Sequence, residues 1–147
     1  MVRAWWEERM AQAETFADWL AIANLKAAYC RLLDTKDWAG WAQLFTRDVV
    51  VDVTGSGGTV EHGREAFVAS VRASIETTRT AHQVHSPEIE IDGDSATGIW
   101  AMQDHLVWAD GRTLTGYGHY HERYVRQGSG WLIAEQKLTR LIMKTSN

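Results

Sequence analysis

The chain is poor in the residues that several common kinds of site require. Its one cysteine, Cys30, cannot form a disulfide within the chain or build a cysteine-based zinc site. No stretch approaches the roughly 18 consecutive apolar residues of a membrane-spanning helix. The 15 lysines and arginines are scattered, and the formal net charge is −4. These features disfavour nucleic acid or an anionic membrane as the main partner, because both need clustered positive charge.

Motifs for several kinds of catalysis are also missing. No Gly-x-Ser-x-Gly elbow occurs, so a serine hydrolase has no support. The glycine-rich run 55–58 lacks a P-loop lysine and is interpreted as a loop at a pocket rim. No His-x-x-x-His spacing falls on a predicted helix, so we expect neither a metal nor a cofactor. Residues 1–9 are charged and unlike a signal peptide, which favours a cytoplasmic protein.

What is present describes one globular domain. The chain has 147 residues, 45% of them hydrophobic and 23% charged, which is an ordinary composition for such a domain. Eight tryptophans are unusual for this length. They indicate either core and interface packing or the aromatic wall of a large, flat, apolar pocket. We therefore expect a small hydrophobic organic molecule as the ligand.

The order of the predicted elements gives the fold class. Residues 1–14 are expected to form an N-terminal, helical extension, and residues 15–147 a single domain. A variant capping box at 15–18 opens a first helix to Asp34, whose apolar stripe includes Phe16 and Leu20. Helices at 38–45 and 64–74 flank a strand at 49–53. The remaining strands span 82–91, interrupted by Pro87, then 96–108, 113–126 and 131–141.

Helices followed by long antiparallel strands predict an α+β fold. Strands of this length must curl. We expect a strongly curved, mostly antiparallel sheet that forms a cone-shaped barrel, with about three N-terminal helices packed on its concave face.

Three polar residues occupy positions where a core prefers apolar ones: Tyr29, Asp34 and His82. A phenol, a carboxylate and an imidazole can move protons on an uncharged organic molecule. Each has a structural alternative, as a core tyrosine, a helix-end aspartate bonded to local backbone, or a strand histidine. Tyr29 points about 140° away from Asp34 on an ideal helix, so the two converge only if the helix ends between them or a pocket wraps its tip.

Asp104 is out of place for a different reason. By the period of two along a strand, it shares a face with Trp100, Met102, Leu106 and Trp108. A lone carboxylate on an apolar face must be paired or functional. Arg140 is either its partner or a clamp for the substrate. His119 and His121 alternate with Tyr120 and Tyr124, and parity does not tell which set faces the interior.

Several segments together resemble a SnoaL-like domain of the nuclear transport factor 2-like superfamily. They are Tyr29 with Asp34, the run from Asp37 to Val50, Gly63-Arg64, and the tail segments 91–96, 116–120 and 130–133. The resemblance covers residues 16–141 and implies a cone-shaped α+β barrel with a pocket between sheet and helices. The superfamily includes dehydratases, isomerases, cyclases and proteins that only bind, so the fold alone does not fix the function.

Within that group the pattern is nearest to the bile-acid dehydratase type. That resemblance implies His82, Asp34 and Tyr29 as catalytic residues, and Asp104 and Arg140 as substrate contacts. The scytalone dehydratase pattern fits less well, because its tyrosine and aspartate are adjacent; His119 is a candidate for its second histidine. Trp38 and Trp100 are further candidate substrate contacts.

The resulting hypothesis is a cofactor-independent lyase acting on a polycyclic, terpenoid or aromatic substrate, with loss of water or formaldehyde. Tyr29 would donate a hydrogen bond to the developing oxyanion or the leaving hydroxyl. The alternatives are an isomerase or cyclase of the same fold, or a non-catalytic ligand-binding or dimerisation domain. The sequence does not identify the substrate.

The resemblance also implies a homodimer formed through the outer sheet face. Sedimentation velocity at micromolar concentration should therefore give the mass of two chains. A single species with the mass of one chain would contradict the expectation.

Overall fold

The computed structural model describes residues 2–146; Met1 and Asn147, the outer ends of the predicted extension and domain, lie outside them. Three helices precede most of the sheet: α1 (Val2–Asp34), α2 (Trp38–Ala42) and α3 (Arg64–Ile75). A short 3-10 turn, η1, spans Thr54–Ser56. The strands are β1 (Phe45–Asp52), β2 (Val60–His62), β3 (Arg79–Asp92), β4 (Ser95–Val107), β5 (Thr113–Gln127) and β6 (Gly130–Ser146).

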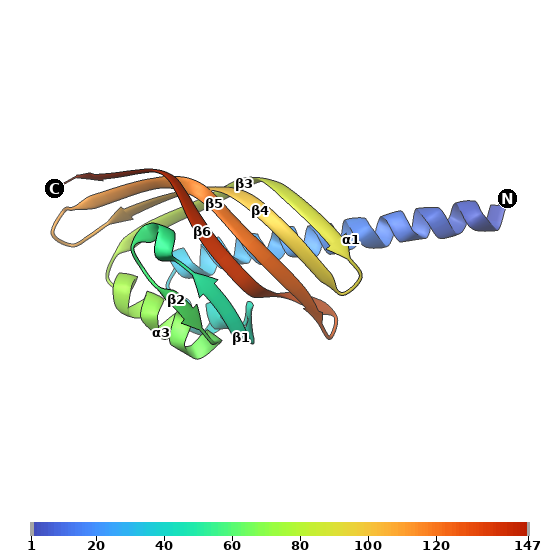
Figure 1. The fold of residues 1–147 in the computed structure, drawn as a ribbon, viewed down its shortest axis with the longest axis horizontal. Helices are drawn as coiled ribbons and strands as arrows, with labels where there is room; N and C mark the ends of the chain where they lie inside the picture. Colours follow the sequence, from blue (N-terminus) through green and yellow to red (C-terminus); the bar gives the residue numbers. More distant parts are fainter. Residues whose placement is uncertain (1, 147) are drawn as a thin grey trace.

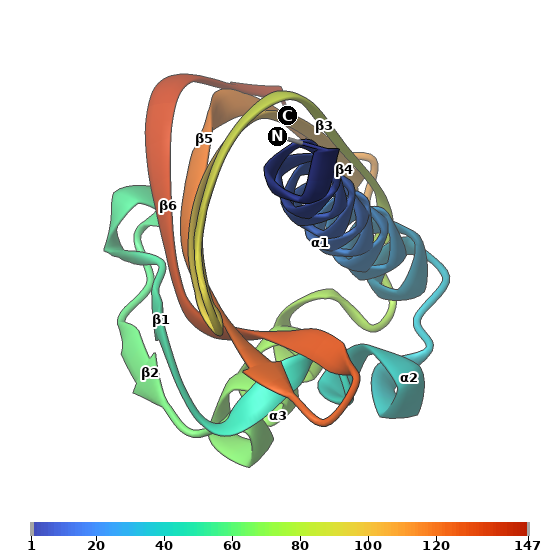
Figure 2. The ribbon, with the colours of Figure 1, turned by 90° about the vertical axis from the view of Figure 1, so that its right-hand side faces the viewer.

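The six strands form one curved sheet in the order β2-β1-β6-β5-β4-β3. All neighbouring pairs are antiparallel except β1 and β6, which run parallel. The sheet curls around α1, which lies in its concavity, while α2 and α3 cover the lower part (Figure 2). The α+β prediction is confirmed, and the sheet stays open between its edge strands β2 and β3.

The first helix is longer than the sequence suggested. The predicted start at residue 15 is wrong, because Thr15 donates its hydroxyl to the Ala11 carbonyl (2.9 Å), as a threonine within a helix does. The first turns of α1 project beyond the sheet (Figure 1). Phe16 and Leu20, expected in the buried stripe, are therefore 65% and 45% exposed. The buried residues of α1 lie further along: Ile22, Lys26, Tyr29, Cys30 and Leu33.

Two other boundaries differ from expectation. The second helix ends at Ala42, and Phe45 already belongs to β1. Pro87 does not divide β3, because the pairing of β3 with β4 shifts register between His85 and Glu88 and then continues. A bulge of this kind leaves residues unpaired, so the missing N–H of proline costs no ladder bond. None of the helices within residues 2–146 has both the length and the hydropathy to cross a bilayer.

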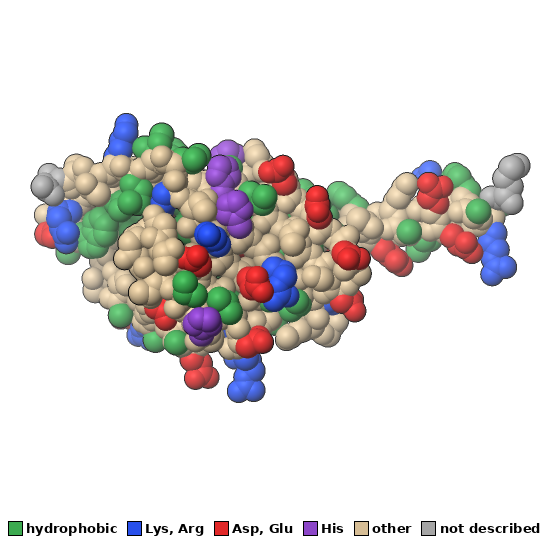
Figure 3. All heavy atoms as spheres, viewed as in Figure 1, with side chains coloured by type: hydrophobic (Ala, Val, Ile, Leu, Met, Phe, Trp, Pro, Cys, Tyr) green, Lys and Arg blue, Asp and Glu red, His purple; other side chains and the backbone are tan. Residues whose placement is uncertain are grey.

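The alternation of side chains across the sheet divides its strands into an inner and an outer face. Trp100, Met102 and Asp104 on β4 are all buried on the inner face, as are Tyr120 and Tyr124 on β5. Their neighbours in sequence therefore point outward. The space-filling view shows histidine side chains gathered over the outer surface of the sheet (Figure 3).

Asp18 links the middle of α1 to strands β5 and β6. Its carboxylate accepts two hydrogen bonds from the Arg126 guanidinium (2.9 and 2.7 Å) and one from the Trp131 indole (3.0 Å). Arg126 also pairs with Asp94 in the turn between β3 and β4. The hydrogen-bonded Arg126 holds the pKa of Asp18 below its ordinary value.

Because the pKa of Asp18 is lowered in the folded protein, its hydrogen bonds to Arg126 and Trp131 stabilise the fold at pH values above the ordinary carboxyl pKa. This stabilisation is lost as the pH falls through the lower pKa of Asp18 in the folded state. Asp18→Asn should lower the melting temperature by a few degrees at pH 7 and by little near pH 2. Glu135→Gln, which breaks an exposed pair with Arg123, serves as control and should change it less. A decrease in melting temperature in Asp18→Asn that is the same at pH 7 and pH 2 would contradict this prediction.

Candidate active site

A cavity of about 410 Å³ lies between the helices and the inner face of the sheet. Its volume is in the range of small-molecule sites, roughly 300–1,000 Å³. All three helices, five strands and the segment around η1 contribute to it. The lining is mainly apolar and includes Leu33, Trp41, Phe67, Val71, Ile75, Leu106, Trp108, Leu114 and Leu138. Polar residues face the same space: Tyr29, Ser56, Thr59, Glu61, Ser70, Ser74, His82, Asp104, Tyr120, Gln136 and Arg140.

His82 and Asp34 form a close pair beside this cavity. The distance from His82 Nδ1 to Asp34 Oδ1 is 2.6 Å. The backbone N–H of His82 donates to the other carboxylate oxygen (2.7 Å). The last residue of α1 is thus bonded to both the main chain and the ring of one residue on β3. This double contact fixes the position of the imidazole as well as its orientation.

The partners of Asp34 determine which nitrogen of the histidine is free. A carboxylate oxygen only accepts hydrogen bonds, so His82 Nδ1 carries a proton, and in the neutral imidazole Nε2 has the free lone pair. Asp34 Oδ1 also accepts from the Thr80 hydroxyl (2.9 Å), which in turn accepts from Lys36 Nζ (2.8 Å). The pKa of Lys36 is lowered by partial burial, which the charge of Asp34 opposes. The arrangement presents a basic nitrogen held by an oriented carboxylate.

Asp104 and Arg140 form a second pair directly beside the first. Asp104 is the cross-strand partner of His82 on the inner face. Arg140 donates to both of its carboxylate oxygens (2.8 and 2.7 Å), and both side chains are nearly buried. Arg140 Nε also donates to Ser56 Oγ (2.8 Å), so the pair ties β6 to the η1 segment. The sequence left two roles open for Arg140, as the partner of Asp104 or as a clamp for the substrate. The structure shows it bonded to Asp104.

Gly116 provides the space for this ion pair. It is the partner of Asp104 on β5. A Cβ placed at Gly116 would overlap the Arg140 guanidinium and the Asp104 carboxylate. The glycine is therefore required by close approach and not by an unusual backbone angle.

Tyr29 lines the cavity but does not contact Asp34. Its hydroxyl donates to Gln136 Oε1 on β6 (3.1 Å). The helix continues unbroken through both residues, so they point to opposite sides of the concavity, as the 140° separation indicates. Burial, followed by the charge of Glu122, raises the pKa of Tyr29 well above that of a free phenol. Tyr29 is therefore a neutral phenol at the cavity wall.

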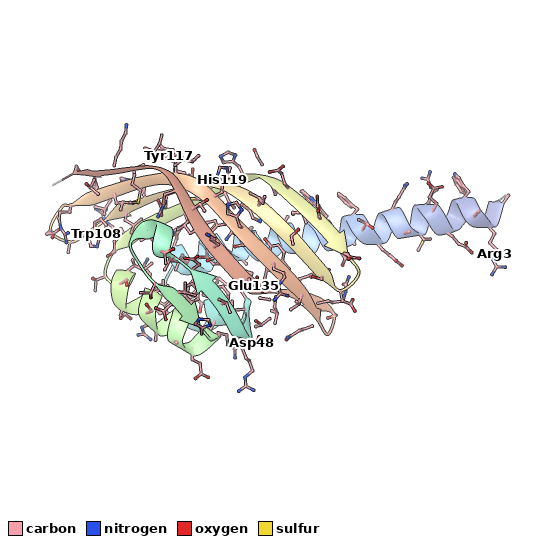
Figure 4. The ribbon with its side chains drawn as sticks, in the orientation of Figure 1. Arg3, Asp48, Trp108, Tyr117, His119 and Glu135 are labelled. Atoms are coloured by element: carbon pink, nitrogen blue, oxygen red, sulfur yellow. The ribbon has the colours of Figure 1, made fainter. Side chains whose placement is uncertain are left out.

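Three predicted substrate contacts lie outside the cavity. His119 is on the outer face of β5 (Figure 4). Its ring centroid lies 6.2 Å from that of His121. Trp100 shares the face of Asp104 but lies four residues away, about 13 Å along the strand, where its indole donates to Tyr124 (2.8 Å). Trp38 lies in a groove between α2 and α3. Parity along a strand predicts the face of a residue but not its distance from the site.

Residues other than His119, Trp100 and Trp38 line the cavity. Trp41 and Trp108 are the tryptophans that line the cavity. A buried polar group was also missed: Lys26, Glu122 and Gln136. Glu122 is a carboxylate on the apolar strand face of Tyr120 and Tyr124. A carboxylate on an apolar strand face is the signal that identified Asp104. Lys26 lies one helical turn from Ile22 and from Cys30, within the buried stripe.

Cys30 belongs to the core, as its place on the helix stripe predicted. It is 8% exposed, and burial raises its pKa to about 11. A thiol of this kind is not a nucleophile at neutral pH. Among residues 2–146, no group of three or more histidine, cysteine or acidic side chains is arranged to hold a metal ion.

Comparisons with known proteins agree with this architecture. The family model of the SnoaL-like domain matches residues 14–137. A probable cyclase of Gibberella zeae is 27% identical over 136 residues, which cover 84% of this chain and 91% of the relative. Rv3472, a Mycobacterium tuberculosis protein of unknown function, is 33% identical with a TM-score of 0.78, over 88% of this chain and 75% of its own.

A type 2 hexachlorocyclohexane dehydrochlorinase superposes with a TM-score of 0.83 over 92% of this chain and 93% of its own. At 14% identity this likeness concerns the fold alone. Enzymes are therefore among the proteins that share this fold or sequence.

The close approach at Gly116 leads to a stability prediction. Gly116→Ala should displace the Asp104–Arg140 pair and lower the free energy of unfolding by about 1–3 kcal/mol, measured by urea denaturation. Gly130→Ala is the control, because a Cβ there meets open space. Equal effects of the two substitutions would show that the ion pair does not need the glycine.

Proposed function

The chain belongs to the SnoaL-like domain family, and on that basis we propose that its cavity is the active site of a cofactor-independent lyase. The observation that carries the proposal is the His82–Asp34 pair, with its 2.6 Å contact beside a largely apolar cavity. Such a pair supplies a general base without a metal or an organic cofactor. The apolar lining supports a polycyclic, terpenoid or aromatic substrate.

In the proposed reaction His82 Nε2 takes a proton from a carbon made acidic by a neighbouring carbonyl or extended π system. Asp34 stabilises the imidazolium through Nδ1. The electron pair of the broken C–H bond forms a C=C bond, and the C–O bond to the leaving hydroxyl breaks. The imidazolium returns its proton to that oxygen, and water leaves. Loss of a hydroxymethyl group as formaldehyde would begin with proton removal from its hydroxyl by the same base.

The Asp104–Arg140 pair is proposed to position a polar end of the substrate. The guanidinium of Arg140 is held at the cavity wall by contacts with Ser56, Asp104 and Met102. Its guanidinium offers fixed donors for a carbonyl or carboxylate. A substrate anchored there lies beside His82, because His82 and Asp104 are cross-strand neighbours.

A second function is favoured by one comparison. The curated relative at 27% identity carries the name of a probable cyclase. A cyclase or an isomerase would use the same base to move a proton without expelling a leaving group. The products distinguish the reactions, since only elimination changes the mass by loss of water or formaldehyde.

The test is turnover of a panel of steroids, terpenoids and lignin-type aromatics, followed by mass spectrometry. His82→Ala should reduce turnover by about 10²–10⁴-fold, the usual contribution of a general base. Asp34→Asn should also reduce it, because the amide no longer stabilises an imidazolium.

His105→Ala is the matched control, a histidine beside Asp104 that bonds Thr115 at an exposed position. Turnover should be unchanged in this variant. Unchanged turnover in His82→Ala would refute the proposed mechanism, and binding without turnover of any panel member would favour a non-catalytic ligand-binding domain.

A further inference from the structure

A chain of buried polar side chains runs from α1 to the cavity wall and has no part in the proposed reaction. Lys26 Nζ contacts Glu122 Oε1 (2.5 Å), and both side chains are fully buried. Gln136 Nε2 contacts the same carboxylate oxygen (2.5 Å), and Gln136 Oε1 accepts from Tyr29. Tyr29 and Gln136 line the cavity. A buried charge pair is costly, so its connection to a cavity residue requires a reason.

The charge pair fixes the first direction in this chain. An ionised carboxylate accepts hydrogen bonds and cannot donate one. The Lys26 ammonium lies beside Glu122 and over the rings of Tyr29 and Tyr120, 3.7 and 3.6 Å from their centroids. The hydroxyl of Tyr124 donates to the second oxygen of Glu122. Every neighbour of Glu122 is thus a donor, which is consistent with an ionised acceptor.

Glu122 in turn fixes the amide of Gln136. If the amide were reversed, its carbonyl oxygen would face the carboxylate and two acceptors would meet. The NH₂ group therefore points to Glu122, and the carbonyl oxygen points to Tyr29. That carbonyl oxygen can only accept, so the O–H of Tyr29 must donate to it. The direction of all three hydrogen bonds follows from one buried charge.

The proton of Tyr29 is committed to Gln136, so Tyr29 can meet a ligand only with an oxygen lone pair. We infer that Tyr29 binds its ligand as a hydrogen-bond acceptor, so that the cavity selects molecules with a hydroxyl at this wall over ketones of the same shape. The positioning residues that keep Tyr29 an acceptor toward the ligand are Lys26, Glu122 and Gln136. The inference rests on the proposed function only in taking the cavity as the ligand site. It reverses the donor role that the sequence suggested for Tyr29.

The test compares two ligands of nearly equal size, 1-tetralol and 1-tetralone, by isothermal titration calorimetry at pH 7. The alcohol can donate a hydrogen bond and the ketone cannot. The protein should bind the alcohol about 2- to 10-fold more tightly, which corresponds to one hydrogen bond between neutral groups. In Tyr29→Phe the ratio of the two dissociation constants should fall to about one.

A second variant tests the chain of hydrogen bonds from Lys26 to Tyr29 and leaves Tyr29 unchanged. Replacing the charge pair by neutral groups, Lys26→Met with Glu122→Gln, lets the amide of Gln136 turn, so Tyr29 can donate to the ketone. The preference for the alcohol should be lost. Tyr124→Phe is the matched control, because it removes a donor to the other oxygen of Glu122 and leaves the Gln136 contact intact. It should keep the preference.

Equal or tighter binding of the ketone by the unaltered protein would overturn the inference, as would a preference that survives in Tyr29→Phe. A loss of preference in Tyr124→Phe would show that general disturbance of the core is responsible. Failure of the proposed function has a different signature: turnover would be unchanged in His82→Ala, while the preference for the alcohol would persist. The two proposals can therefore fail separately.

Discussion

The carboxylate of Asp34 joins the end of the longest helix to the free edge of the sheet. Strand β3 pairs with β4 on one side only, so the outward N–H of His82 needs a partner from elsewhere. Asp34 provides it and, with its other oxygen, holds the imidazole of the same residue. An exposed strand edge is a site of aggregation, and proteins cover such edges. Here the group that covers the edge also orients the candidate base, so one interaction serves both the fold and the site.

Around this contact the site is built from paired polar groups within an apolar shell. The Asp104–Arg140 pair is adjacent to the His82–Asp34 pair, and the buried Lys26–Glu122 pair stands behind Tyr29. Asp104 and Lys26 each have a partner of opposite charge, and Asp34 is bonded to His82, so this polar wall is arranged before a ligand arrives. Preorganisation of this kind avoids the cost of reorienting dipoles during a reaction. The apolar side of the cavity, formed largely by the helices, places few constraints on the chemistry of the ligand.

The sequence identified the site residues that stand out against their own surroundings. Asp104 was found because it interrupts an apolar strand face, and Asp34 and His82 because they occupy positions where a core prefers apolar residues. Lys26 could not be found in the same way, because a helical period tolerates one polar residue and its partner is 96 residues away. Trp100 and His119 show the limit of strand parity. Parity gives the face only once the interior is known, and it carries no information on position along a strand.

The parallel pairing of β1 with β6 has a consequence for how the chain acquires its structure. Val51 pairs in register with Gln136, so β1, which has β2 on one side, finds its second neighbour only in the last strand. Contacts so distant in sequence close late and slow the folding of a domain. During synthesis the ribosome must release β6 before β1 has its second partner strand and before the amide of Gln136, which orients Tyr29, is in place. The emerging chain therefore holds Lys26 unpaired until β5 follows, and its cavity takes shape with the final strand.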